Sequence, residues 1–310
     1  MLGGTGHYGR HIVRSLVAKG VPVRVLTRSV ARARGLIPET VELTEGDLES
    51  RDAVTRALDG VDRVVVAVSA FSRDQIRKMV AVERDAVIAA LDQAEAAGIK
   101  RVVYVSVFDV QPRQMPHQVR PDIGTVKQDV EAYLKSSGFD WTVLGAPPSM
   151  DLFFAMVHGG RMIVPGGGPK SLPTISPADL GEIAAQAVLR DDLGGQRIRV
   201  AGPEPLSFPE VARRLSALYG RTIRFTALPL LLPRIAWYAT WPLAKLSSSF
   251  EYVHAILGFI QLLNAFPQDI ALASVKDCEN LVRIFTYTPT TLEMEARRRQ
   301  QPSQARRAVE

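Results

Sequence analysis

Short apolar runs alternate with amphipathic stretches along the first 146 residues of the chain. The runs have the length of β-strands, and between them apolar residues recur at helical spacing. We predict strands over residues 23–27, 41–44, 64–68, 102–106 and 141–144, and helices over residues 9–19, 51–58, 75–97 and 125–137. This alternation indicates an α/β fold, a doubly wound parallel sheet of the Rossmann type with helices on both faces.

The pattern loosens after residue 146. Residues 147–169 are rich in proline and glycine, which favours loops that close over a site. We therefore divide the chain into a dinucleotide-binding core, a smaller and mainly helical C-terminal lobe, and a disordered basic tail, over residues 1–146, 147–299 and 300–310.

Elements typical of the core return within the lobe, over residues 176–219. Ser176 and Pro177 predict the start of a helix that ends near residue 189, and a strand is expected over residues 197–201. Ser207 and Glu210 have the spacing of a capping box for a helix that ends near residue 219.

Residues 226–268 are nearly free of charge. Arg234, Lys245 and Glu251 are the charged residues there, and prolines interrupt any long helix. The stretch falls short of the roughly 20 continuous apolar residues that a membrane-spanning helix needs. We expect helices that pack on the lobe and expose an apolar face to a lipid surface or a protein partner, with a wholly internal helical subcore as the alternative.

Three glycines open the chain at three-residue spacing. Gly3, Gly6 and Gly9 stand where a strand would pass into a helix. A dinucleotide-binding turn needs glycine there, because the backbone must turn tightly, approach a pyrophosphate closely and let the helix pack on the sheet. The helix N-terminus adds N–H groups for the phosphates. Since a strand usually has about five or six residues, we expect the natural chain to begin a few residues upstream.

Together with later segments, this motif makes the chain resemble the atypical short-chain dehydrogenases/reductases of the NmrA-like, NAD(P)-binding kind. The matching segments are residues 3–10, 25–28, 45–48, 97–106 and 127–144, with weaker matches at 176–180 and 289–293. The resemblance implies a bound dinucleotide, with a small-molecule substrate held between the carboxyl edge of the sheet and the C-terminal lobe.

The end of the strand predicted over residues 23–27 distinguishes NADP from NAD. An acidic residue there would accept hydrogen bonds from the ribose of NAD and repel the 2′-phosphate of NADP. This chain has Thr27, Arg28 and Ser29 at that point, and Arg32 and Arg34 follow. A guanidinium can bind the phosphate and stack on adenine, so we predict NADP in preference to NAD. A solvated arginine is the alternative.

The resemblance implies further cofactor contacts. Asp47 and Leu48 match the pair that flanks the adenine, and residues 67–69 would lie along the ribose and nicotinamide. The predicted cofactor site comprises Gly3, Thr5, Gly6, His7, Tyr8, Gly9, Thr27, Arg28, Ser29, Asp47, Leu48, Ala67, Val68, Ser69 and Lys127.

The usual catalytic tyrosine is missing. In typical members of the wider family a tyrosine four residues before a lysine donates the proton, but here position 123 is Ile before Lys127. We expect Lys127 to hold the nicotinamide ribose or to act as the acid, as a lysine does in the isoflavone-type reductases that the chain resembles. It would then matter for turnover much more than for folding, and a surface lysine is the alternative.

Other residues near this segment are weaker candidates. Ser106 matches the serine position of the family and could bind a carbonyl oxygen, or its hydroxyl could bond to local backbone instead. Asp109, His117 and Asp122 are also within sequence reach of the site.

Two functions stay open. The first is an NADPH-dependent reductase of a small, apolar carbonyl or enone, in which Lys127 or Ser106 stabilises the developing oxyanion. The second is a non-enzymatic dinucleotide-binding redox sensor, regulator or assembly factor, which the missing tyrosine favours. The same absence argues more strongly against epimerisation or dehydration of a nucleotide sugar.

Charge and composition narrow the partners. Lys and Arg outnumber Asp and Glu by 38 to 32, a net charge of +6 that suits an anionic cofactor or membrane surface. Because the basic residues are scattered, we predict no nucleic-acid binding. The histidines and the single cysteine, Cys278, lack metal-ligand spacing, so no metal site is predicted. We expect a cytoplasmic protein, peripheral to a membrane if residues 226–268 bind lipid.

Overall fold

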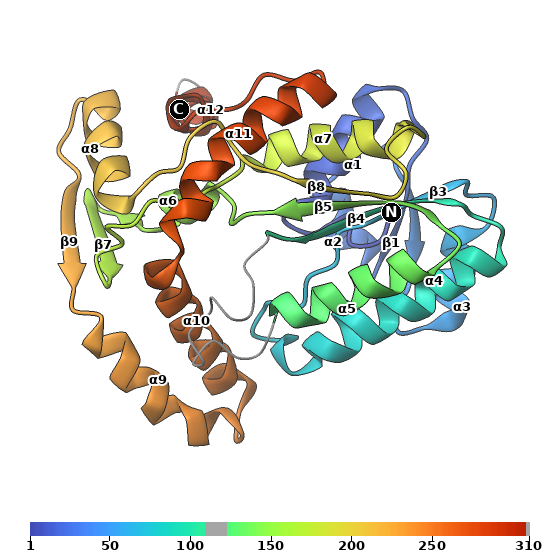
Figure 1. Ribbon diagram of the computed structural model, residues 1–310, viewed down its shortest axis with the longest axis horizontal. Helices are drawn as coiled ribbons and strands as arrows, with labels where there is room; N and C mark the ends of the chain where they lie inside the picture. The colour runs from blue at the N-terminus through green and yellow to red at the C-terminus, as the bar shows by residue number, and fades with distance from the viewer. Residues whose placement is uncertain (109–122, 308–310) are drawn as a thin grey trace.

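The computed structural model describes residues 1–108 and 123–307, and a parallel sheet runs through its centre (Figure 1). Its strands are β1 (Arg24–Thr27), β2 (Glu42–Glu45), β3 (Arg63–Val66), β4 (Arg101–Val107), β5 (Asp140–Ala146) and β8 (Gln196–Arg199). Leu2 pairs in parallel with both Leu26 and Val66, so the segment before the glycine loop lies between β1 and β3. The order β2-β1-Leu2-β3-β4-β5-β8 confirms the predicted doubly wound sheet.

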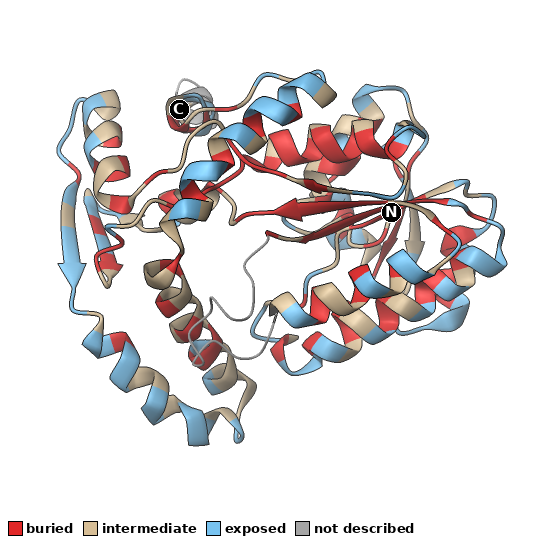
Figure 2. Cartoon of the chain, viewed as in Figure 1, coloured by how far each residue is buried: buried red, intermediate tan, exposed pale blue. Residues whose placement is uncertain are grey.

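Helices cover both faces of this sheet. On one face α1 (Gly9–Ala18) packs against α7 (Pro177–Leu189), and on the other lie α3 (Arg51–Leu58), α4 (Ala86–Ala96) and α5 (Ile123–Ser136). Because helices cover both faces of the central strands, β4 and β5 consist mainly of continuous buried residues (Figure 2), whereas the edge strands β2 and β8 are largely exposed or half-buried. The short helix α2 (Val30–Arg34) follows β1 directly.

The helix predicted over residues 75–97 is divided. A 3₁₀ turn, η1 (Ile76–Lys78), and a π-helical turn, η2 (Ala81–Asp85), precede α4. The π-turn places the carboxylate of Glu83 inside the protein, where it accepts a hydrogen bond from the Ala70 N–H at 2.6 Å. The prediction of one continuous helix was wrong, because apolar spacing does not reveal where a buried carboxylate will find its donors.

The C-terminal region contains a second, smaller sheet. The helix α6 (Asp151–Ala155) leads into the hairpin of β6 (Val157–His158) and β7 (Arg161–Pro165), and β7 pairs in parallel with β9 (Arg224–Leu228). The expectation that residues 147–169 form only loops was therefore wrong. The strand β7 forms because it pairs with β9, which is far away in the sequence, and local composition does not indicate such a pairing.

The two helix starts predicted in this region differ in outcome. The Ser176 side chain accepts a hydrogen bond from the Ala178 N–H and caps α7, as predicted. At α8 (Phe208–Tyr219) the Ser207 side chain makes no capping hydrogen bond, and Glu210 instead lies 3.8 Å from Arg214. The prediction of a capping box was wrong, because Arg214 offers the Glu210 carboxylate a charged partner.

Most of the nearly uncharged stretch of residues 226–268 is helical, as predicted, although β9 extends to residue 228. The helices are α9 (Leu231–Ala244) and α10 (Ser248–Ala265), which pack against each other. Ala255 of α10 is buried against Ala70 and Val82 of the core, whereas α9 lies at the edge of the molecule and is largely exposed (Figures 1 and 2).

The chain then passes through α11 (Gln268–Ile284) into α12 (Leu292–Arg307), which continues beyond residue 300, where we expected the tail to begin. Within residues 1–108 and 123–307, no single helix is long and apolar enough to cross a membrane. The pair α10 and α11 meets the length and composition criteria together but is bent by 82°.

Candidate active site

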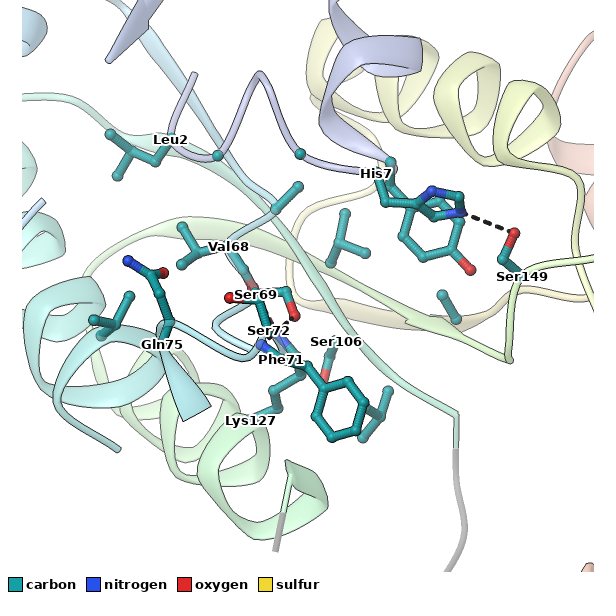
Figure 3. Close-up of a pocket in the computed structure, with 18 of the residues that line it drawn as sticks. Leu2, His7, Val68, Ser69, Phe71, Ser72, Gln75, Ser106, Lys127 and Ser149 are labelled. Carbon is teal, nitrogen blue, oxygen red and sulfur yellow. Dashed lines mark hydrogen bonds between the residues drawn. The ribbon is translucent and has the colours of Figure 1, made fainter. Parts of the chain in front are cut away.

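A cavity of about 770 Å³ lies at the carboxyl ends of β1, β3 and β4, and α10 forms part of its wall. Figure 3 shows His7 of the glycine loop on one side of it, with residues 68–75, Ser106 and Lys127 on the other. The predicted residues that line it are Gly3, Thr5, Gly6, His7, Tyr8, Thr27, Arg28, Asp47, Leu48, Ala67, Val68, Ser69, Ser106 and Lys127. Gly9 and Ser29, also predicted, are not part of this lining.

The glycine loop has the geometry that a close phosphate contact needs. Gly3 has a φ of +78°, and a Cβ there would lie 2.4 Å from the carbonyl oxygen of Ala67. A Cβ on Gly9 would lie 2.0 Å from the Gly3 carbonyl oxygen, so Gly9 serves the packing of α1 on the loop. The first turn of α1 has neither an acidic residue nor a side-chain cap. This uncompensated positive end fits the pyrophosphate of a dinucleotide.

His7 and Tyr8 connect the glycine loop to the chain that follows β5. The His7 Nε2 lies 3.0 Å from the Ser149 Oγ and 3.5 Å from an Asp151 carboxylate oxygen. The Tyr8 hydroxyl donates to the carbonyl of Pro147 at 3.2 Å. Partial burial lowers the pKa of His7, against the opposing charge of Asp151. These contacts attach the C-terminal region to the glycine-loop end of the cavity.

The arginines after β1 divide into two groups. The exposed side chains of Arg28 and Arg32 line the cavity. Arg34 instead donates to the carbonyls of Glu39 and Val41, at 2.8 and 2.9 Å. Ser29 caps α2 by accepting a hydrogen bond from the Arg32 N–H. It therefore helps to position the arginines of α2 and does not itself line the cavity. Two guanidinium groups therefore remain at this end of the cavity, where the 2′-phosphate of NADP is expected.

Asp47, the acidic residue that follows β2, already uses one of its carboxylate oxygens within the protein. One carboxylate oxygen of Asp47 accepts a hydrogen bond from the Glu49 N–H at 3.0 Å, which shapes the turn into α3. Its neighbour Leu48 packs against the core from the cavity wall. This arrangement fits the predicted pair at the adenine, with one polar and one apolar contact.

Lys127 is a buried residue, with 7% of its surface exposed. Its Nζ donates to the Val68 carbonyl at 2.9 Å and lies 2.9 Å from a carboxylate oxygen of Glu83, which is itself 1% exposed. The alternative of a surface lysine was therefore wrong. This burial argues against the expectation that Lys127 matters much less to folding than to turnover, because its loss would leave the Glu83 carboxylate buried without a charged partner.

Ser106 lines the cavity but is hydrogen bonded within the protein. Its hydroxyl donates to Glu131, whose carboxylate also binds the Arg197 guanidinium at 2.7 Å. Arg197 donates in turn to the carbonyl of Val107 at 2.9 Å. The network connects the end of β4 to α5 and β8, and it leaves the carbonyl-binding role of Ser106 a prediction.

Neither Tyr104 nor Tyr133 lines the cavity beside Lys127. Tyr104 lies under the ammonium, with its ring centre 5.6 Å from Nζ, but its side chain is buried outside the cavity lining and burial raises its pKa. Tyr133 donates to Asp92 on the far side of α5, at 2.5 Å. Asp109, His117 and Asp122 lie outside the described residues.

The apolar part of the lining was not predicted as part of the site. It includes Phe71 and Phe108 together with Ala255, Gly258, Phe259, Leu262 and Leu263 of α10 and Phe266 directly after it. The scarcity of charge over residues 226–268 was the available signal, and we had assigned it to an external surface. Which face of an apolar helix meets a cavity is decided by the fold.

Comparison with known proteins agrees with this geometry. The NAD(P)H-binding domain family matches residues 3–191. An NAD(P)H azoreductase of Xenophilus azovorans is 33% identical over 234 residues, covering 74% of this chain and 77% of the relative. The photosystem II assembly factor Ycf39 of Guillardia theta is 26% identical, covering 87% and 84% of the two chains.

Solved structures share the fold over nearly the whole chain. The structure of the Citrobacter sp. triphenylmethane reductase, determined with NADP(H), superposes with a TM-score of 0.71 at 16% identity and covers 96% of this chain and 98% of that one. The glycine loop, the sheet order and the family match lead to one conclusion. This chain belongs to the NAD(P)H-binding family, Rossmann-fold proteins of the atypical short-chain, NmrA-like kind.

Proposed function

We propose that this protein is an NADPH-dependent reductase of a small, apolar, conjugated acceptor, such as an enone or a quinone-like carbonyl. One observation carries the proposal: a single cavity extends from the glycine loop and Arg28 to an apolar wall formed by Phe71 and α10. The names of relatives, an azoreductase among them, support the reduction of flat conjugated molecules.

Each end of the cavity suits one reactant. The amides of the glycine loop and the guanidinium groups of Arg28 and Arg32 would hold the phosphates of the cofactor. Bound NADPH would supply a hydride. At the other end, the Phe71 and Phe259 rings lie 6.3 Å apart and offer an apolar surface that excludes water from the acceptor.

Lys127 provides the positive charge beside the reacting end. An ammonium has three N–H donors; Lys127 donates one to the Val68 carbonyl and forms an ion pair with the Glu83 carboxylate. Another of its N–H groups could donate to a ribose hydroxyl or to an oxygen that gains negative charge as the acceptor is reduced. The Glu83 carboxylate would orient the ammonium throughout.

Titration calorimetry with NADPH and NADH tests the cofactor part of this proposal. We expect tighter binding of NADPH, and Arg28→Ala should lower that affinity about 10- to 100-fold while changing NADH binding less than about twofold. Arg34→Ala is the matched control, because its side chain binds carbonyls away from the cavity. Equal or tighter binding of NADH by the unmodified protein would refute NADPH selectivity.

A panel of quinones, enones and azo compounds, assayed by NADPH oxidation, tests the reaction. A second candidate function, a non-enzymatic dinucleotide-binding assembly factor or sensor, is favoured by the engagement of Ser106 with Glu131 and of Lys127 with Glu83. The similarity to Ycf39 is consistent with it. NADPH binding without oxidation across the panel would support this second function.

A further inference from the structure

The helix α9 exposes a row of apolar side chains along one side. At about 100° per residue, Leu231, Ile235, Tyr238 and Pro242 lie within about 60° of one another around the helix. Leu231 is 61% exposed and Ile235 is 55% exposed. Trp241, on the adjacent side of the helix, and Leu246, just after the end of α9, add apolar surface at the C-terminal end, at 61% and 76% exposure. We call these six residues the α9 face.

The opposite side of α9 is the one that the fold uses. There the Trp237 ring stacks on His254 of α10, with ring centres 4.6 Å apart, and the Thr240 hydroxyl lies 3.1 Å from the His254 Nδ1. Pro233 is buried on the same side. The orientation of α9 is therefore set by specific contacts with α10, and the α9 face is left toward solvent (Figure 2).

The charges around the α9 face are positive. Arg234 and Lys245 lie eleven residues apart, which places both on one edge of the helix at its two ends. Among the described residues neither forms an ion pair, and α9 contains no acidic residue. Glu251, the acidic residue nearest in sequence, is bound by the Arg77 guanidinium at 2.8 Å.

We propose that α9 docks on the surface of an anionic lipid bilayer, lying in the plane of the interface. An apolar face with a tryptophan and a tyrosine, bordered by cations, is the pattern of interfacial helices. Its cations favour anionic headgroups over a second copy of this chain, because a copy would bring the same uncompensated cations to the contact. The inference is independent of the proposed reaction, since the α9 face is not part of the cavity lining.

Flotation with vesicles tests the docking. The full-length protein should float with phosphatidylcholine vesicles that contain about a quarter phosphatidylglycerol, and much less with phosphatidylcholine alone. Replacing both cations, Arg234→Gln and Lys245→Gln, should lower the partition coefficient about fivefold for each charge removed. Raising the salt concentration should weaken binding in the same direction.

Substitutions in the apolar surface provide the decisive comparison. Leu231→Glu with Ile235→Glu should abolish flotation and leave NADPH affinity and thermal unfolding unchanged. Leu272→Glu, at a 67% exposed position on α11, is the matched control and should float like the unmodified protein. The proposal is overturned if the unmodified protein does not float at low salt, or if the Leu231 and Ile235 variant floats equally well. It is also overturned if these substitutions dissolve a dimer in sedimentation equilibrium while no vesicle binding occurs.

Discussion

Two walls of the cavity present different chemical groups: the glycine loop presents main-chain groups, and α10 presents side chains. In the first wall backbone packs on backbone, since Gly3 and Gly9 approach neighbouring carbonyls too closely for any side chain. In the second wall apolar side chains such as Phe259 and Leu262 form the surface. A ligand shared across a family can be held by main-chain groups, whereas the choice of acceptor depends on side chains that change readily.

The two walls are also anchored differently. The glycine loop follows directly after Leu2, which pairs on both sides within the sheet. The helix α10 is attached to the core by contacts between side chains and loops, including the Arg73 guanidinium on Ser249 at 2.9 Å and the ion pair of Arg77 with Glu251. We therefore expect mutations to affect stability mainly in the first wall and acceptor binding mainly in the second.

The largest effect is expected at Lys127, which joins the core helix α5 to the segment that enters the cavity. Lys127→Met should lower the free energy of unfolding by about 3–5 kcal/mol, because it leaves the Glu83 carboxylate buried without a charged partner. Urea denaturation measures this change. Lys135→Met, at an exposed position of the same helix, is the control.

A double variant tests the cause of the Lys127 effect. Adding Glu83→Gln removes the buried charge while keeping an acceptor for the Ala70 N–H, so it should recover part of the lost stability. If Lys127→Met alone were as stable as the unmodified protein, the ion pair would not hold in solution.

The next effect is expected in the glycine loop. Gly9→Ala should lower the free energy of unfolding by about 1–3 kcal/mol and weaken NADPH binding, because α1 must move away from the Gly3 carbonyl. Gly35→Ala is the control, since Gly35 has a φ of −80° and the nearest atom to its added Cβ lies at 3.8 Å. Unchanged NADPH affinity in the Gly9 variant would argue against the tight loop geometry.

A smaller effect, on binding rather than folding, is expected in the α10 wall. Phe259→Ala should raise the KM for an apolar acceptor about tenfold, the loss expected for part of a buried aromatic contact. The dissociation constant of NADPH should change less than about twofold. Val253→Ala, on the exposed side of α10, is the comparison variant. An equal loss of NADPH and acceptor binding would mean that the two walls do not act separately.

The smallest effect is expected from pH, through His11 on α1. Burial, followed by the nearby charges of Arg10 and Arg14, lowers the pKa of His11 from 6.5 to about 4. The unfolded chain therefore binds the proton more readily than the folded protein, and stability should fall as the pH drops from about 6.5 to about 4.

His11→Gln should remove this part of the pH dependence, about 1 kcal/mol after allowance for the partial exposure of the ring. His158→Gln, at an exposed position on β6, should leave it in place. Thermal melts at several pH values measure the slope, and an identical slope in the His11 variant would exclude this histidine as its source.

Local patterns predicted the core well, for reasons visible in particular residues. The valines of β3 and the glycines before α1 act through their own conformational preferences and their immediate neighbours, so their order in the chain is informative. The position of Arg28 directly after β1 likewise placed it in the cavity lining. Arg34, six residues later, could not be distinguished from it, because its partners are carbonyls that the turn of the chain brings near.

By itself the sequence determined the alternating sheet, the glycine loop and the basic residues beside it, because these follow from periodicity and from backbone requirements of single residues. Only the tertiary structure decided that Lys127 would pair with Glu83, that Ser106 would donate to Glu131, and that α10 would form the wall of the cavity while α9 exposes its apolar side. Each of these contacts joins residues from separate elements of the chain. A buried polar group must find a hydrogen-bond or ion-pair partner, and only the fold determines which partner lies within reach.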